Sequence, residues 1–164
     1  MGPRTRKSPL RHLLWIIPLV VLDFFIFRWL ALRPGTFIPR EETDPQYGLN
    51  LLGIGVHRAD VAQAHLRALQ SDLANEAFIT TAGVPFTREE SDELLTDARA
   101  VILRHFPQAE ALEAAGHALP ISLGLAFSVE KARRLLGYEP EHTFGKWLEG
   151  WVAGQGEAGR KEDG

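Results

Sequence analysis

The chain has 164 residues, of which 45% are hydrophobic and 24% charged, with no cysteine and a formal net charge of −3. This length suits one domain of ordinary size, and the composition is that of a globular protein. The lack of cysteine excludes a disulfide scaffold, a cysteine nucleophile and a thiolate metal site. The slightly negative net charge gives no indication of a basic surface for nucleic acid, so we expect no nucleic-acid partner.

The N-terminal forty residues begin with a basic stretch and continue into an apolar one. The apolar run Leu13–Leu32 is twenty residues long, which is enough to span a bilayer as a helix. The basic flank favours a signal-like segment or membrane anchor, whereas Asp23 and Arg28 make insertion costly. The alternative is an apolar helix up to about Leu22 followed by a buried strand over Phe24–Leu32. Both interpretations stay open at this point.

The next segment contains breakers, a weak strand and a helix. Arg40–Asn50 is polar and contains proline and glycine, which predicts a loop. Leu51–His57 predicts a short strand, weakened by its two glycines. Asp60 and Gln63 form a capping-box pattern, so Asp60 is predicted to cap a helix. The apolar positions expected on the buried face of this helix are Val61, Ala64, Leu66 and Leu69.

A second strand and a second capped helix follow. Phe78–Thr81 is rich in strand-forming residues, and the chain then turns at a glycine and a proline. Thr87 and Glu90 form another capping-box pattern, which predicts one helix that begins at Arg88 and ends before Pro107. The residues expected to be buried by this helix are Leu94, Leu95, Ala98, Val101, Ile102 and Phe106.

The C-terminal third is predicted to contain short helices. Ala109–His117 predicts a short helix that stops near a glycine, and Leu119–Phe127 a connector or short strand. Ser128 is placed to cap the next helix, and Gly137 to end it in a left-handed conformation. Thr143 is expected to open a last helix that carries two tryptophans, followed by a disordered polar tail over residues 153–164.

Four segments follow one another in a recognisable order. They are L-R-P-G-T-F-I-P (Leu32–Pro39), G-V-H-R-A-D-V-A-Q-A-H-L-R-A-L (Gly55–Leu69), A-F-I-T-T-A-G-V-P-F-T-R-E-E (Ala77–Glu90) and S-V-E-K-A-R-R-L-L-G-Y-E-P (Ser128–Pro140). Their order resembles the C-terminal half of the NAD-dependent epimerase/dehydratase family, the extended short-chain dehydrogenase/reductases. The first segment is similar to the family's L-R-P-x-N-x-x-G-P and the second to its V-H-V-x-D-V-A-x-A. The third is similar to a later strand with a capped helix, and the fourth to a helix near the C-terminus of the family.

The resemblance covers roughly Trp29–Trp151 and implies an α/β fold. The expected fold is a partial Rossmann-type C-terminal region, with helices and a few short strands, preceded by an apolar N-terminal segment. The expected division is residues 1–22 for that N-terminal segment, 23–152 for the epimerase/dehydratase-like region and 153–164 for the tail.

The resemblance also implies NAD or NADP as cofactor and a nucleotide-sugar or another carbonyl or hydroxyl substrate. However, no glycine-rich dinucleotide loop precedes Leu32, and neither Tyr47 nor Tyr138 has a lysine four residues later. We therefore expect a truncated or degenerate relative that is inactive alone, with no catalytic or cofactor-binding residue assigned. The alternative is a membrane-anchored, non-enzymatic binding module derived from that fold.

Three residues are predicted to bind substrate. Arg33 suits a phosphate or carboxylate, with a salt bridge at the sheet end as its structural alternative. Thr36 stands about where the family has a substrate-contacting asparagine, and His57 belongs to the V-H-V-like motif. Gly53 occupies the place of a phosphate-binding arginine, which argues against a nucleoside-diphosphate sugar. Asp60 is predicted to be a structural cap.

No metal site is predicted, because the histidines lack the helical i, i+4 spacing of zinc-binding pairs. The expected partners are a small-molecule substrate and either a cofactor-domain partner or a second copy of the chain. Trp147 and Trp151 would mark a partner surface if exposed. A cytoplasmic location is expected, with a single-pass membrane anchor through residues 13–32 as the alternative.

Overall fold

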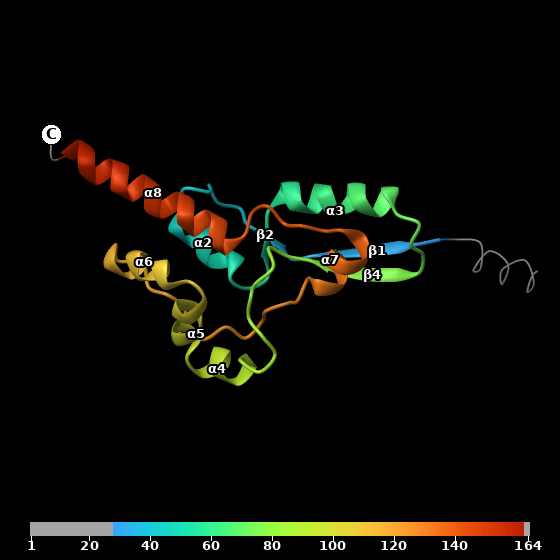
Figure 1. Ribbon diagram of the computed structural model, residues 1–164, viewed down its shortest axis with the longest axis horizontal. Coiled ribbons are helices and arrows are strands. Elements are labelled where there is room, and N and C mark those ends of the chain that lie inside the picture. The colour runs from blue at the N-terminus through green and yellow to red at the C-terminus, as the bar shows by residue number, and fades with distance from the viewer. Residues whose placement is uncertain (1–27, 163–164) are drawn as a thin grey trace, which may run out of the picture.

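The computed structural model describes residues 28–162, with side chains described through residue 155. Short parallel strands and a larger number of helices form a mixed α/β fold, as expected (Figure 1). In chain order the elements are β1 (Leu30–Pro34), β2 (Thr36–Phe37), α2 (Pro45–Leu51), β3 (Gly55–Val56), α3 (Arg58–Gln70), β4 (Glu76–Thr80), α4 (Ser91–Thr96), α5 (Ala98–His105), the 3₁₀ turn η1 (Pro107–Ala109), α6 (Glu110–Ala114), α7 (Glu130–Leu136) and α8 (Phe144–Glu162).

β1 and β2 form one extended segment that changes its partner at Gly35. β1 pairs in parallel with β4, and β2 pairs in parallel with β3. At the junction the Gly35 amide donates to Thr80 O at 3.0 Å, and the Thr36 amide donates to Ile54 O at 2.8 Å. A Cβ at Gly35 would lie 1.9 Å from the Ile54 carbonyl oxygen, so only glycine allows β3 to approach this closely.

The C-terminal end of the apolar N-terminal run belongs to the sheet. Leu30–Leu32 lie in β1, so the last three residues of the run Leu13–Leu32 form part of a strand rather than part of a helix. Among the described residues, no helix combines the length and the apolar character needed to cross a bilayer. Residues 1–22 and the other positions before Arg28 lie outside the described residues.

A first hydrophobic core lies between the β1–β4 pair and the helices α3 and α7, which contact each other and β4 (Figure 1). Val61 and Ala64 are buried on α3 as predicted, but Leu66 and Leu69 are 54% and 84% exposed, so that part of the prediction is wrong. The helix needs only a narrow stripe to cover two strands, and Leu66 falls outside it. The buried residues of this core are Ala64, Phe78, Val129, Ala132, Leu136 and Tyr138.

A second, larger core joins α2, α4, α5, α6 and α8. The polar loop predicted over Arg40–Asn50 is wrong in its second half, which forms α2. Asp44 Oδ1 accepts a hydrogen bond from the Gln46 amide at 2.8 Å, and proline stands at the first turn, so the helix start is locally encoded. The residues buried in this core are Tyr47, Leu51, Leu52, Ala82, Leu94, Ala98, Val101, Ile102, Ala109, Leu112, Leu119, Phe144 and Leu148.

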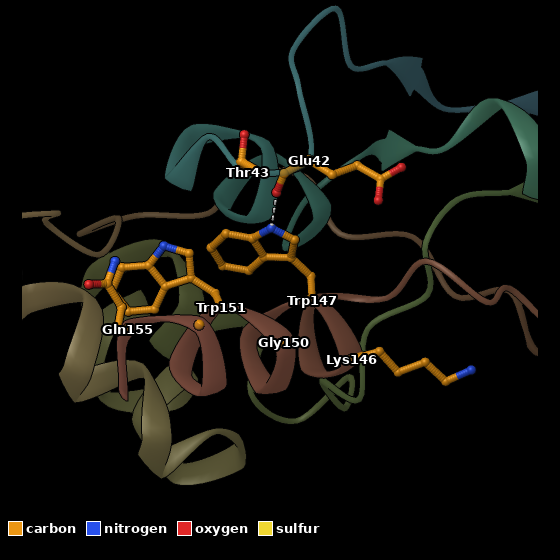
Figure 2. Close-up of a pocket in the computed structure, with 8 residues that line it drawn as sticks. Glu42, Thr43, Lys146, Trp147, Gly150, Trp151 and Gln155 are labelled. Atoms are coloured by element: carbon orange, nitrogen blue, oxygen red, sulfur yellow. Dashed lines mark hydrogen bonds between the residues drawn. The ribbon is translucent and has the colours of Figure 1, made fainter. Parts of the chain in front are cut away.

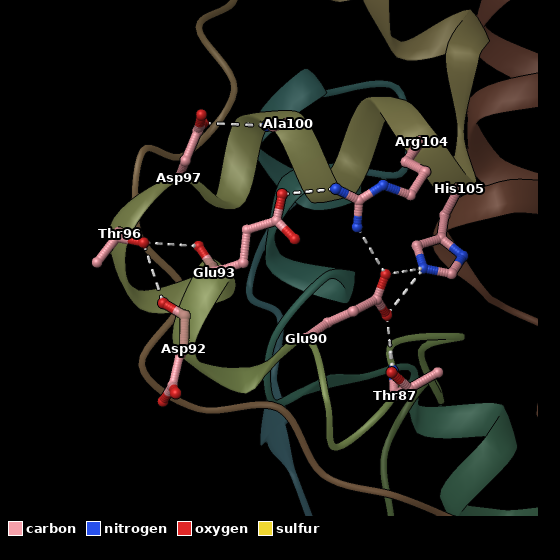
Figure 3. Close-up of polar contacts among 9 residues, drawn as sticks. All are labelled: Thr87, Glu90, Asp92, Glu93, Thr96, Asp97, Ala100, Arg104 and His105. Carbon is pink, nitrogen blue, oxygen red and sulfur yellow. Dashed lines mark hydrogen bonds and ion pairs between the residues drawn. The ribbon is translucent and has the colours of Figure 1, made fainter.

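The single helix predicted from Arg88 to Phe106 is two helices, α4 and α5, which meet at Asp97. The Asp97 backbone leaves helical geometry, with φ −148° and ψ 64°, and its carboxylate accepts from the Ala100 amide at 3.1 Å (Figure 3). Asp97 therefore caps α5 and ends α4. Leu94 is buried on this segment as predicted, whereas Leu95 is exposed.

Glu90 ties the two helices together, as Figure 3 shows. Its carboxylate accepts from the Thr87 amide at 2.8 Å, one of the two bonds of the predicted capping box. The predicted helix start at Arg88 is wrong, because α4 begins at Ser91 with Glu90 as its N-cap. The same carboxylate contacts His105 Nε2 at 2.9 Å and Arg104 Nη1 at 3.0 Å, both on α5. The Thr87 amide bond, followed by the contacts to His105 and Arg104, lowers the pKa of Glu90 to about 2.

The predicted C-terminal end of α7 is confirmed, whereas its N-cap is Val129 and the predicted cap Ser128 lies one residue before it. Ser128 Oγ accepts from the Glu130 amide at 3.2 Å, and Gly137 adopts φ +66°. The Tyr138 amide then donates to Ala132 O at 3.2 Å, which closes the left-handed stop.

The last helix begins where the sequence predicts and extends further than predicted. Thr143 Oγ1 accepts from the Lys146 amide at 3.3 Å, and α8 continues to Glu162 where a disordered tail was predicted from residue 153. Glutamate, alanine, arginine and lysine dominate this stretch and are good helix formers, which offsets its glycines.

Candidate ligand-binding site at the carboxyl ends of β2 and β3

A cavity of about 220 Å³ lies where β2 and β3 end; we call it the His57 cavity. Ligands of open α/β sheets bind outside the carboxyl ends of parallel strands, so this place is a natural candidate. The cavity is lined by Phe37, Ile38, Arg40, Glu41, Glu42, Tyr47, Val56, His57 and Arg58.

His57 is positioned by the start of α3. Its Nδ1 accepts from the Ala59 amide at 3.3 Å, so His57 itself, rather than Asp60, is the N-cap. Its Nε2 lies 3.4 Å from Glu42 Oε1, and its ring centroid lies 3.7 Å from that of His142. Burial lowers the pKa of His57, and the neighbouring His142 lowers it further, which favours the neutral imidazole.

Asp60 is not the predicted helix cap; it lies in the first turn of α3 and holds the loop before α8. Its two carboxylate oxygens accept from the amides of Glu141 and His142 at 2.9 and 3.1 Å, and Oδ1 also contacts His142 Nδ1 at 3.1 Å. The side chain is buried, so these contacts are shielded from water. With Nδ1 as the donor to Asp60, neutral His142 keeps Nε2 as an acceptor.

Tyr47 contributes a hydroxyl without a partner. The residue is 2% exposed, and within the described part of the chain its buried hydroxyl makes no hydrogen bond. Burial, reinforced by the negative charges of Glu42 and Asp60, raises the pKa of Tyr47 to about 12. The phenol therefore stays protonated, and its residue lines the His57 cavity.

The structure separates the three residues predicted to bind substrate. His57 lies in the His57 cavity, whereas Thr36 lines a neighbouring cavity of about 200 Å³ that shares Phe37 and Ile38 with it. Arg33 is an exposed residue of β1 that pairs in register with Ile79 and lines neither cavity.

Glu42 also borders a second, larger hollow of about 480 Å³ against α8, shown in Figure 2. The Trp147 Nε1 donates to the Glu42 backbone oxygen at 2.6 Å, and the Trp147 and Trp151 rings lie 6.2 Å apart in a near-parallel arrangement. Both tryptophans are half-buried and pack against the second core, so a large part of each ring surface is covered by the chain itself.

Sequence reasoning missed Glu42, Tyr47 and His142 as site residues. They come from the loop before α2, from α2 itself and from the loop before α8, so no spacing in the sequence links them to His57. Only the D-P signal at Asp44 points to α2, which positions Tyr47.

No protein-family model matches the chain. No curated protein matches it either. Among solved structures, it is similar to UDP-N-acetylglucosamine 4-epimerase from Bacillus cereus, at 15% identity over 83% of this chain and 47% of that chain, with a TM-score of 0.42. It is also similar to RMD from Pseudomonas aeruginosa complexed with NADPH, at 17% identity, 82% and 51% coverage and a TM-score of 0.39. The chain spans about half the length of these structures, and such TM-scores do not establish a shared fold.

Proposed function

We propose that this chain is the substrate-side portion of a truncated or degenerate NAD-dependent epimerase/dehydratase-like protein, and that it binds a small polar molecule in the His57 cavity. The observation that carries the proposal is the convergence of Glu42, Tyr47 and His57 on one cavity at the carboxyl ends of two parallel strands.

The packing of the four family-like segments supports the first part of the proposal. They supply most of the strands β1 to β4 and the helices α3 and α7, of which β1, β4, α3 and α7 pack around the first core. The parallel pairing of β1 with β4 also fits a strand–helix–strand arrangement of the Rossmann type.

The chemistry of the His57 cavity favours a hydroxyl-rich molecule. Glu42 offers an acceptor, Tyr47 a donor, and His57 either, while Arg40 is already paired with Asp44 at 2.8 Å. At about 220 Å³ the cavity is smaller than the roughly 300–1,000 Å³ of drug-sized sites. A single monosaccharide therefore fits it better than a nucleotide-sugar, in line with Gly53 at the arginine position.

Neither tyrosine supplies the acid/base pair of the resembled family. The Tyr47 hydroxyl is held protonated by its raised pKa, and the buried Tyr138 hydroxyl donates to Thr81 O at 2.8 Å. Tyr138 also has a raised pKa, caused by burial. We accordingly expect no turnover by this chain alone.

The strand-to-helix turn from β3 to α3 is poorly suited to a dinucleotide. A pyrophosphate needs free amides and glycines at a helix N-terminus. Here His57 caps the helix, and the buried Asp60 carboxylate in its first turn would repel phosphate. NAD or NADP, which the resemblance implies, is thus expected not to bind this chain tightly.

Heteronuclear NMR with D-glucose, D-glucuronate and UDP-glucose as probes tests the ligand site. We expect saturable shifts of the amides of Glu42, Tyr47, Val56 and His57 with a monosaccharide probe. Tyr47→Phe should weaken binding by about threefold to tenfold, because one hydrogen bond is worth about 0.5–1.5 kcal/mol. Tyr138→Phe is the matched control and should leave the affinity unchanged. The proposal would be contradicted if no probe shifted any amide, or if the shifts were confined to amides outside the His57 cavity.

A further inference from the structure

We propose that Glu42, His57 and His142 form a binding site for a divalent transition-metal ion, with Zn²⁺ as the best fit. One ligand atom of each residue lies within 4.8 Å of those of the other two. Two imidazoles and a carboxylate are a donor set that zinc accepts readily. This inference goes beyond the proposed small-molecule role and does not depend on it.

The distance between Glu42 and His57 suits a small tetrahedral ion. His57 Nε2 and Glu42 Oε1 are 3.4 Å apart. Two ligands at about 2.0–2.1 Å from a tetrahedral zinc ion are about 3.4 Å from each other. The widest ligand separation, at most 4.8 Å, must close by up to about 1.4 Å, and the Glu42 side chain is 59% exposed and able to swing. The His57 and His142 rings, whose centroids lie 3.7 Å apart, must also turn apart to direct both lone pairs at one ion.

Asp60 orients one of the imidazoles from behind. It accepts from His142 Nδ1 at 3.1 Å, which leaves Nε2 as the nitrogen with a free lone pair. Asp60 is itself fixed by the amides of Glu141 and His142. A carboxylate behind a metal-binding histidine sets its tautomer and raises its basicity, and this contact is a recurring part of zinc sites.

His57 must give up one weak contact to bind an ion. Its Nδ1 accepts from the Ala59 amide at 3.3 Å, whereas a neutral imidazole that binds metal through Nε2 carries its proton on Nδ1. This capping bond is long, so its loss costs little. Arg58 borders the cavity and opposes a cation, which limits the affinity.

The open coordination position would provide a partner for the Tyr47 hydroxyl, which has none among the described residues. Three protein ligands leave one position of a tetrahedral ion open, as in catalytic rather than structural zinc sites. Tyr47 and His57 line the same cavity, and a water bound there offers the acceptor that the buried hydroxyl lacks among the described residues.

The test is calorimetric titration of the tag-free full chain with ZnCl₂, with Co²⁺ absorption as the geometric readout. We expect one equivalent to bind and Co²⁺ to show the intense visible bands of four coordination. Glu42→Gln, His142→Ala and His57→Asn should each weaken Zn²⁺ binding by at least tenfold. Asparagine at position 57 keeps a capping acceptor, so this variant separates the ligand role from the cap.

His65→Asn, on the exposed side of α3, is the matched control and should bind Zn²⁺ like the unmodified chain. Circular dichroism confirms that each variant is folded. The proposal would be overturned if the unmodified chain showed no saturable Zn²⁺ binding. It would also be overturned if the folded His142→Ala and Glu42→Gln variants bound Zn²⁺ as tightly as the unmodified chain. The sugar titrations are run on metal-free protein, so failure of one proposal leaves the other standing on its own result.

Discussion

At the scale of single residues, the Asp60 carboxylate has the most consequential surroundings. It is 1% exposed and accepts hydrogen bonds from two backbone amides and one imidazole of the same loop. Because the loop leads directly into α8, one side chain of α3 fixes the start of the last helix and the orientation of His142.

We predict that Asp60→Ala lowers the free energy of unfolding by about 1–3 kcal/mol, because two part-buried amides and the His142 imidazole lose their acceptor. Urea denaturation measures this loss. Asp72→Ala, an exposed substitution, should stay within about 0.5 kcal/mol of the unmodified chain. Equal stabilities of the two variants would show that Asp60 does not hold the loop.

At the scale of elements, the features set by local sequence signals were predictable, whereas those set by tertiary contacts were not. The ends of α7 were predictable to within one residue because Ser128 accepts from the first amide of the helix and Gly137 provides its left-handed stop. The break at Asp97 was not, because an apolar pattern continues across it and only the observed backbone shows the change of direction. The exposure of Leu69 likewise depends on which elements cover α3.

The α4–α5 contact through Glu90 predicts a pH dependence. The folded pKa of about 2 lies below the ordinary value of 4.5, so ionised Glu90 stabilises the fold above about pH 4.5. That stability is lost as the pH falls from about 4.5 toward 2. Glu90→Gln should be less stable near neutrality and show a shallower loss across this window. Urea midpoints at several pH values measure this pH dependence of stability, with Glu89→Gln as the exposed control. If stability fell with pH in parallel for Glu90→Gln and the unmodified chain, Glu90 would not be the group responsible.

The packing of α2 against α8 predicts opposite effects for two glycines. A Cβ at Gly48 would lie 2.1 Å from the Trp147 ring, so Gly48→Ala should cost about 1–3 kcal/mol and shift tryptophan fluorescence. Gly150 on α8 has no atom within 4 Å of such a Cβ, and Gly150→Ala should stabilise the chain by up to about 1 kcal/mol. Thermal unfolding and emission spectra compare the two. An unperturbed Gly48→Ala variant would show that the ring does not rest on α2.

At the scale of the whole molecule, the candidate site arises from the order in which distant segments meet. The motif predicted His57 as a candidate site residue, but Glu42 and His142 become its neighbours only when β2 pairs with β3 and the loop before α8 returns to Asp60. The mixed α/β class was predictable from the motif order. The partner change at Gly35 and the separation of Arg33 and Thr36 from His57 follow from strand pairing, which no local pattern encodes.

The central claim is that this chain carries a substrate-side cavity without a dinucleotide site. Calorimetric titration of the full chain with NAD⁺, NADH, NADP⁺ and NADPH tests it most directly. We predict no saturable binding in the micromolar range for any of the four, because His57 and Asp60 occupy the strand-to-helix turn from β3 to α3. One-to-one binding of any of these dinucleotides with micromolar affinity would contradict the account.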